Sequence, residues 1–202
     1  GEQNVSHMDP VAMRATFNIM SWMLPLAGGK TFRSAPPIFR ESLVFPYFQG
    51  MLFVLAVAGE GGWEAIHEVY ATPPLSTEQI LHPDKYLREV DVPQQVILPE
   101  LADVLPDDWQ RLGGNCLGEL QTRILLKRVP GSSVAAAGWD GDRYDVYRNA
   151  AGNLALVYAS VWDSPGDAQE FAAAYRRYRQ LSEPVAANQP LADDQPADSN
   201  NP

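Results

Sequence analysis

Residues 143–162 read RYDVYRNAAGNLALVYASVW, and this stretch decides the fold class. Residues 143–148 and 154–162 alternate in polarity and are rich in Tyr, Val and Trp, and the Asn-Ala-Ala-Gly-Asn cluster at 149–153 separates them. Alternating segments of this composition on either side of a turn cluster predict a β-hairpin. The last third of the chain therefore contains β-structure.

A helix is predicted immediately after the hairpin. Asp163 or Ser164 can cap it, because Pro165 then occupies the first helical position, where a missing N–H costs nothing. The helix should continue to about Leu181, with three aromatic side chains directed inward: Phe171, Tyr175 and Tyr178.

Several further helices are expected before the hairpin. The first covers residues 9–27, with Asp9 as its cap and an apolar face of Met13, Phe17, Met20 and Leu24. A short helical piece at 38–43 should precede a central helix that starts near Pro46 and runs to about Ala58, and a glycine break at 59–62 should separate it from a helix at 63–71. Ser76 and Gln79 form a capping box, and the remaining expectations are a short strand at 95–98 and a helix at 115–127.

The sequence therefore predicts an α+β fold, a mostly helical bundle followed by a β-hairpin packed with a C-terminal helix. The expected boundaries are a helical region at 1–128, a hairpin-plus-helix subdomain at 129–182 and a disordered tail at 183–202. The tail consists of Pro, Ala, Asp, Asn and Gln with almost no apolar anchor, a composition that cannot bury a core.

The bulk composition excludes some partners. The net charge is −10 and the pI is about 4.7, which disfavours nucleic acid because phosphate contacts need a basic patch. Leu43 to Gly59 is the most apolar run, but it is shorter than a membrane span requires, so a buried core helix and no membrane span are expected. The single cysteine, Cys116, is expected to be a core thiol.

Three sets of residues have partial chemical signatures. His67-Glu68 would begin a zinc-peptidase motif, but position 71 is Ala rather than His, so His67 is interpreted as a surface or groove residue on an amphipathic helix. His82 in His82-Pro83-Asp84 could act as a general base, against the alternative of a structural turn in which His82 bonds to backbone. The acids at positions 140, 142 and 145 lack calcium-loop spacing and predict a solvated turn.

Residues 45–87 resemble part of the gluzincin metallopeptidases, the group of thermolysin and aminopeptidase N. Phe45-Pro46-Tyr47-Phe48-Gln49-Gly50 followed by Gly61-Gly62-Trp63 is similar to the helix pair that follows their active site. The run PPLSTEQILHPDKYL at 73–87 looks like a segment of uncharacterised bacterial proteins with a gluzincin-like catalytic half. Those proteins also have a Gly-Trp-x-Gly-Asp-Arg-Tyr hairpin, matched here at 138–144, so the resemblance covers most of residues 2–178.

The resemblance implies a site that this chain contains only in part. Glu2 would match the third zinc ligand, Tyr47 could donate a hydrogen bond to an oxyanion, and His82 is a further candidate catalytic residue. The HExxH helix has no counterpart, so we expect no zinc unless an upstream half supplies the histidines. Whether the protein is an enzyme depends on that upstream segment.

Two functions are therefore expected. The first is a non-catalytic fragment or relic of a zinc-metallopeptidase-like protein, which shapes a peptide groove when the zinc-binding half is present. The alternative is an interaction module of an extracytoplasmic bacterial protein, with a peptide or protein partner bound by aromatic side chains of the C-terminal hairpin: Trp139, Tyr144, Tyr147, Tyr158 and Trp162.

Overall fold

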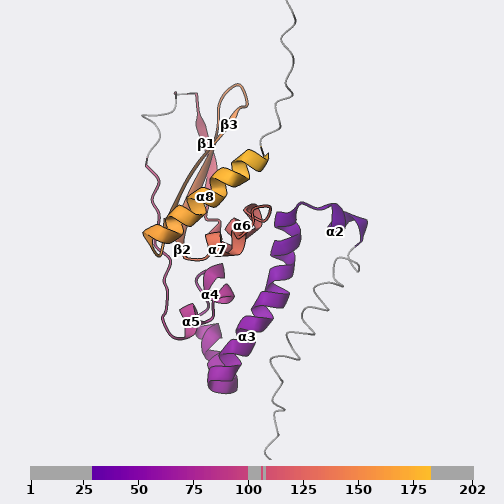
Figure 1. Ribbon diagram of the computed structural model, residues 1–202, viewed down its shortest axis with the longest axis vertical. Coiled ribbons are helices and arrows are strands. Elements are labelled where there is room, and N and C mark those ends of the chain that lie inside the picture. The colour runs from indigo at the N-terminus through magenta and orange to yellow at the C-terminus, as the bar shows by residue number, and fades with distance from the viewer. Residues whose placement is uncertain (1–28, 100–105, 107, 183–202) are drawn as a thin grey trace, which may run out of the picture.

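The computed structural model describes residues 29–99, 106 and 108–182, and these residues make an α+β fold (Figure 1). The expected helix at 9–27, the expected tail at 183–202 and Glu2 lie outside the described residues. The elements in chain order are α2 (Lys30–Ser34), α3 (Pro37–Ala71), α4 (Thr77–Leu81), α5 (Asp84–Leu87), β1 (Gln110–Asn115), α6 (Gly118–Leu125), α7 (Ser132–Ala136), β2 (Trp139–Arg148), β3 (Leu154–Trp162) and α8 (Pro165–Ser182).

Helix α3 joins three segments that the sequence predicted as separate helices. It runs for 35 residues and continues across Pro46, so the predicted helix start near Pro46 is wrong. A proline removes a single N–H donor, and the apolar residues on both sides of Pro46 keep the chain helical. The predicted glycine break is confirmed as a kink, because Gly61 and Gly62 have non-helical backbone angles and Gly62 has a φ of 63°.

The prediction that this helix is a buried core helix is wrong. Its buried side chains are Phe48, Phe53 and Val57, whereas Leu43 is 63% and Tyr47 is 76% exposed. Figure 1 shows α3 along one side of the molecule, with α4, α5 and α6 on its inner side. Apolar composition all round a helix indicates that it will be covered, and here the described residues cover only part of it.

Helix α3 is also long and apolar enough to cross a membrane, with a mean hydropathy of 1.7 in its most apolar window and only 17% of that window buried. Length and composition are weak evidence by themselves. A charged segment packs against the same helix, since Lys127 Nζ lies 2.6 Å from Glu41 and α6 carries Glu119 and Arg123. Glu41 precedes the apolar run at 43–59, so this ion pair does not test a span, and the described residues show no clear one.

The sheet has three antiparallel strands in the order β1-β2-β3. The predicted hairpin is confirmed, with Tyr144 opposite Tyr158 and a turn closed by the Asn149 N–H donating to the Asn153 carbonyl. Strand β1, which the sequence did not predict, includes Gly113 and Gly114. A Cβ on Gly114 would overlap the Asp145 carboxylate, so the absence of a side chain allows the two strands to approach.

Two other sequence predictions need correction near this sheet. The expected strand at 95–98 is not a strand, although the neighbouring Gln94 N–H donates to the Asp140 carbonyl. The expected helix at 115–127 is shorter, because Asn115 belongs to β1 and α6 starts at Gly118. Asn115 pairs with Tyr144 of β2 instead of joining the helix. The sequence around residue 115 contains no signal for this long-range pairing.

Helix α8 covers the hairpin and completes the core. The Ser164 hydroxyl accepts a hydrogen bond from the Asp167 N–H, which identifies Ser164 as its cap. Buried Leu126, Val129, Ala135 and Ala174 form one cluster, and the three aromatic residues predicted to face inward pack against it: Phe171, Tyr175 and Tyr178. This prediction is therefore confirmed.

Candidate functional site

The structure separates the residues that the sequence singled out for chemistry. Tyr47 lies on α3 with 76% of its surface exposed. His82 caps the C-terminus of α4, and its polar contact is with Glu119 on α6. No hydrogen bond or ion pair between described residues joins Tyr47 to His82. The two candidate residues therefore lie on different elements, and no polar contact between them supports a shared site.

His82 is held by a buried carboxylate rather than by backbone, so the prediction of a backbone hydrogen bond is wrong. Its Nε2 atom lies 3.0 Å from the Glu119 carboxylate, whose side chain is fully buried. The hydrogen bond to Glu119 raises the pKa of His82 above its ordinary value, although burial opposes the shift. Arg123, one helical turn along α6, lies 3.7 Å from the same carboxylate.

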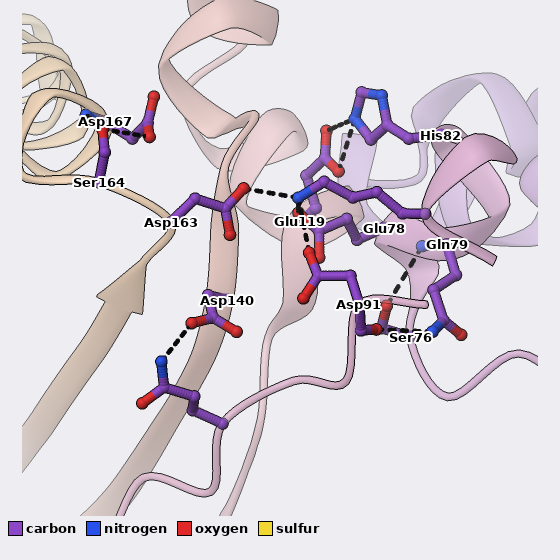
Figure 2. A network of polar contacts seen from close by, with 12 residues as sticks. Ser76, Glu78, Gln79, His82, Asp91, Glu119, Asp140, Asp163, Ser164 and Asp167 are labelled. Carbon is purple, nitrogen blue, oxygen red and sulfur yellow. Dashed lines mark hydrogen bonds and ion pairs between the residues drawn. The ribbon is translucent and has the colours of Figure 1, made fainter. Parts of the chain in front are cut away.

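A second polar cluster surrounds Lys85. Its Nζ atom lies 2.8 Å from Glu78, 2.8 Å from Asp91 and 2.6 Å from Asp163. Figure 2 shows these three carboxylates converging from α4, from the segment after α5 and from the β3–α8 junction. We call Glu78, Lys85, Asp91 and Asp163 the Lys85 cluster. It links segments that are distant in the sequence, so it fixes how α4 and α5 sit against the sheet.

The cap predicted at Ser76 is confirmed and positions Glu78, but the Gln79 side chain reaches back to the Leu75 N–H rather than to that of Ser76. The Ser76 hydroxyl accepts from the Gln79 N–H at 3.2 Å, and the Gln79 carboxamide oxygen accepts from the Leu75 N–H at 2.7 Å. The Gln79 amide also donates to the Asp91 carbonyl. The buried Gln79 side chain therefore ties the start of α4 to the segment that carries Asp91.

Glu78 is a buried carboxyl group with a raised pKa. Its side chain is fully buried, and burial raises its pKa from 4.5 to about 7 despite the opposing hydrogen bond from Lys85. Its Oε2 atom has no hydrogen-bond partner among the described residues. A buried, poorly solvated carboxyl group favours its neutral form, so Glu78 holds a proton at pH values at which ordinary glutamates are ionised.

The Lys85 cluster does not fit a zinc ion. Carboxylate oxygens of Glu78, Asp91 and Asp163 lie within 4.8 Å of one another, which is close enough to surround a metal. The Lys85 ammonium already occupies the space between them, and catalytic zinc is normally held by a set that includes His or Cys. Of the histidines in the described part of the chain, His67 is on the surface and His82 contacts Glu119. These residues therefore do not form a catalytic zinc site.

The three aspartates of β2 are structural, and the prediction of a solvated turn is wrong. Asp142 is 3% exposed, and its carboxylate accepts hydrogen bonds from the Leu117 N–H at 2.7 Å, the Gly118 N–H at 2.9 Å and the Trp139 indole at 2.8 Å. Two of these donors are N–H groups at the start of α6, which have no acceptor within the helix itself. A carboxylate at this position also interacts favourably with the helix dipole. Asp142 therefore caps α6 from another element.

Its two neighbours are also engaged. Asp140 accepts a hydrogen bond from the Gln94 side chain, which ties the segment after α5 to the sheet. Asp145 accepts two hydrogen bonds from Arg111 of β1, at 2.7 and 2.6 Å, and these contacts hold the pKa of Asp145 below its ordinary value. Sequence reasoning missed these roles because Gln94 and Arg111 lie 46 and 34 residues from the aspartates that they contact.

The one cysteine also departs from expectation. Cys116 is exposed and lies between β1 and α6, so the prediction of a core thiol is wrong. The apolar helical pattern that supported the prediction begins only after this residue, since α6 starts at Gly118.

An apolar cleft of about 310 Å³ lies between the second half of α3 and the segment at 72–90. Val57 and Ala65 line it from α3, and Leu75, Leu87 and Val90 line it from the opposite wall. Leu75 is 64% and Val90 is 65% exposed, so apolar side chains are accessible at its rim. Glu68 is the one acidic residue among those that line it. Neither Tyr47 nor His82 lines this cleft.

The aromatic side chains of the hairpin are buried or half-buried. Trp139 is buried and the other four, Tyr144, Tyr147, Tyr158 and Trp162, are half-buried. Trp162 stacks on Phe171 with ring centroids 4.6 Å apart, and Tyr158 contacts the same ring at 6.5 Å. Packing against α8 therefore accounts for the partial burial of Tyr158 and Trp162.

Residues 108–198 match a family described as Domain of unknown function (DUF8575). The described part of this match runs from the residues before β1 to the end of α8, and it includes Asp142 and the hairpin. It covers less than half of the chain and leaves out α3 and the cleft. No curated protein and no solved structure matches the chain.

Proposed function

We propose that this chain is the non-catalytic portion of a gluzincin-like protein and that it shapes a peptide groove when the zinc-binding half is present. The observation that carries this proposal is the apolar cleft between α3 and the segment at 72–90. The residues that resemble the gluzincin helix pair and its following segment, 45–87, include most of both walls of the cleft. The resemblance and the cleft therefore support the same role.

The lining suggests which peptides would bind. Burial of one apolar side chain of a peptide contributes roughly 1.5–3 kcal/mol to the binding free energy. One such residue in the cleft therefore gives weak binding, and contacts from its neighbours in the peptide must add to it. Glu68 favours a basic residue beside the apolar one, and the net charge of −10 favours basic peptides in general. We expect the groove to prefer an apolar residue next to Lys or Arg.

Zinc enters this proposal only from outside the described residues. An upstream HExxH helix would supply the two histidines and the general base, and Glu2 would be the ligand from this chain. We assign no step of peptide hydrolysis to the described residues, because none of their clusters fits the metal.

Peptide binding tests the groove. The full chain is titrated into fluorescent hexapeptides that contain Leu-Arg or Leu-Glu, and anisotropy reports binding. We expect the Leu-Arg peptides to bind better, and Leu75→Asp to weaken binding by about tenfold, equivalent to about 1.4 kcal/mol. Leu154→Asp is the matched control, since Leu154 on β3 is 67% exposed and does not line the cleft.

Failure of all peptides to bind, or equal losses in the two variants, would contradict the groove. The gluzincin-like ancestry is tested separately by reading the native gene immediately upstream of residue 1 and expressing the longer chain. An HExxH segment with bound zinc, measured by elemental analysis, supports the proposal. A longer chain without this segment and without zinc contradicts the zinc-containing form.

A further inference from the structure

Strand β3 forms one edge of the sheet. It pairs with β2 along one side, and no described strand lies along its other side. The hairpin turn is closed by the Asn149 N–H donating to the Asn153 carbonyl, and hydrogen-bonded and non-hydrogen-bonded pairs alternate from there. In this register every second residue of β3 directs its backbone N–H and C=O groups away from β2: Leu154, Leu156, Tyr158, Ser160 and Trp162. We call these backbone groups the β3 edge.

The two outer strands of the sheet differ in how they are protected from further pairing. Strand β1 is six residues long, contains Arg111 and two glycines, and its register with β2 shifts between Arg111 and Gly113. Short length, a charged residue and a bulge each discourage an added strand. Strand β3 is nine residues long, contains no charged residue, proline or glycine, and pairs regularly with β2 from Leu154 to Val161. The β3 edge therefore lacks the protections that β1 has.

Apolar side chains border the β3 edge. Leu154 is 67% and Leu156 is 63% exposed. Alternation along the strand places them on the same face of the sheet as Tyr158 and Trp162, whose rings both contact Phe171 of α8. Figure 1 shows α8 lying across the sheet. The exposed leucines thus continue the apolar surface that α8 covers near the end of β3.

A second copy of this chain fits this edge better than a peptide does. Antiparallel pairing of β3 with β3 about Tyr158 matches the strand to itself over its whole length. Because β3 has no charged side chain, two chains of net charge −10 can meet there without placing like charges opposite each other. The strand is already ordered in each copy, whereas a free peptide loses conformational entropy when it becomes a strand. A basic peptide would also find no acidic side chain on β3.

We propose that the β3 edge pairs antiparallel with the β3 edge of a second copy, centred on Tyr158, so that two three-stranded sheets become one continuous sheet. The two-fold axis closes the assembly as a dimer. Leu154 and Leu156 of each copy lie opposite Trp162 and Ser160 of the other, just before the start of its α8. Nine residues a side is fewer than a standard interface has, so we expect a dissociation constant of roughly 1–10 µM.

Self-association of the full chain tests the interface. Sedimentation velocity between about 0.5 and 100 µM should show a monomer that converts to a dimer and to nothing larger. Leu156→Lys should weaken the association at least about tenfold, because a lysine on an edge strand opposes pairing. Leu112→Lys is the matched control, since Leu112 lies on β1 and is 51% exposed. This control should associate like the parent chain.

Paired cysteines test the register. In a Cys116→Ser background, chains with Val157→Cys are mixed with chains with Ala159→Cys. Pairing about Tyr158 places these two positions opposite each other in a non-hydrogen-bonded pair, where Cα atoms lie about 4.5 Å apart and a disulfide can form. Under mild oxidation the mixture should form a disulfide-linked dimer at least about tenfold faster than either variant alone, because like cysteines are two residues out of register. Mass spectrometry identifies the product.

Amide hydrogen exchange distinguishes the other possible occupants of the edge. The Leu156 and Tyr158 amides should be protected in the dimer and should exchange after dilution to monomer. The Val157 amide, whose residue pairs with Asp145 of β2, should stay protected throughout. Protection of all three amides in the monomer would show that another segment of this chain covers the edge, and it would overturn the proposal.

Four further results would also overturn it. The first is a chain that stays monomeric at every concentration, and the second is a dimer that Leu156→Lys leaves intact. The third is an equal loss of association in the Leu112→Lys control, which would place the contact elsewhere or reflect a general effect of charge. The fourth is an equal rate of disulfide formation in the mixture and in the separate variants, which would exclude the register about Tyr158.

Discussion

Helix α3 exposes apolar side chains, whereas the region around α4, α6 and β2 buries charged ones. On α3, Leu43 and Tyr47 are more than half exposed, whereas Glu78, Glu119 and Asp142 are at most 3% exposed. Each buried carboxylate has a partner from another element: Lys85, His82 or the N–H groups at the start of α6. Residue type therefore decides burial only together with the partners that the fold supplies, because an unpaired buried polar group is costly.

The largest effect should come from removing Asp142. Asp142→Ala leaves two α6 N–H groups and the Trp139 indole without an acceptor in a buried site, which should lower the free energy of unfolding by about 3 kcal/mol. Urea unfolding followed by circular dichroism measures the change. Asp108→Ala, at an exposed aspartate, is the control. A loss of similar size in the two variants would mean that the buried carboxylate does not stabilise this region.

The pH dependence of stability should sharpen the comparison next. The pKa of Glu78 is raised from 4.5 to about 7, so between these pH values the folded state holds a proton that the unfolded state has released. This contribution to stability is complete below pH 4.5 and is lost as the pH rises through 7. Glu78→Gln cannot titrate and should be more stable than the parent by about 2 kcal/mol at pH 8.

Unfolding curves at several pH values measure this effect, and Glu170→Gln on the exposed side of α8 is the control. The groups that face Glu78 are Lys85, Asp91 and Asp163, and all three remain in the variant. A parent protein whose stability does not change between pH 5 and pH 8 would contradict the raised pKa. A Glu78→Gln variant with the same pH dependence as the parent would assign the effect to another group.

The smallest effect concerns His82. Its hydrogen bond with Glu119 raises its pKa, so it stabilises the fold below pH 6.5, and this contribution is lost as the pH rises through the folded-state pKa. Glu119→Gln should move the His82 pKa toward its ordinary value, and nuclear magnetic resonance of the imidazole protons measures it. With Glu170→Gln the titration should not change. An unchanged His82 titration in the Glu119→Gln variant would show that Glu119 does not set this pKa.

Much of the fold was predictable where the signals are local. The hairpin, the Ser164-capped α8, its inward aromatic residues and the Ser76 cap of α4 all depend on residues close together in the chain. Strand β1 was not predictable, because Gly113 and Gly114 have low strand propensity, and the close approach of β2 that requires a glycine at 114 is a tertiary contact. For the candidate site, the structure pairs His82 with Glu119, and the sequence had not singled out the residues that line the cleft.

The sequence by itself determined the α+β class, the turn of the hairpin, the helix caps and the glycine kink in α3, because each results from backbone preferences over a few residues. Only the tertiary structure decided that Asp142 caps α6, that Lys85 fills the space among three carboxylates and that Leu43 and Tyr47 of α3 are more than half exposed. These outcomes depend on which distant segments meet, and the free energy of a buried charge or an apolar side chain is set by those neighbours.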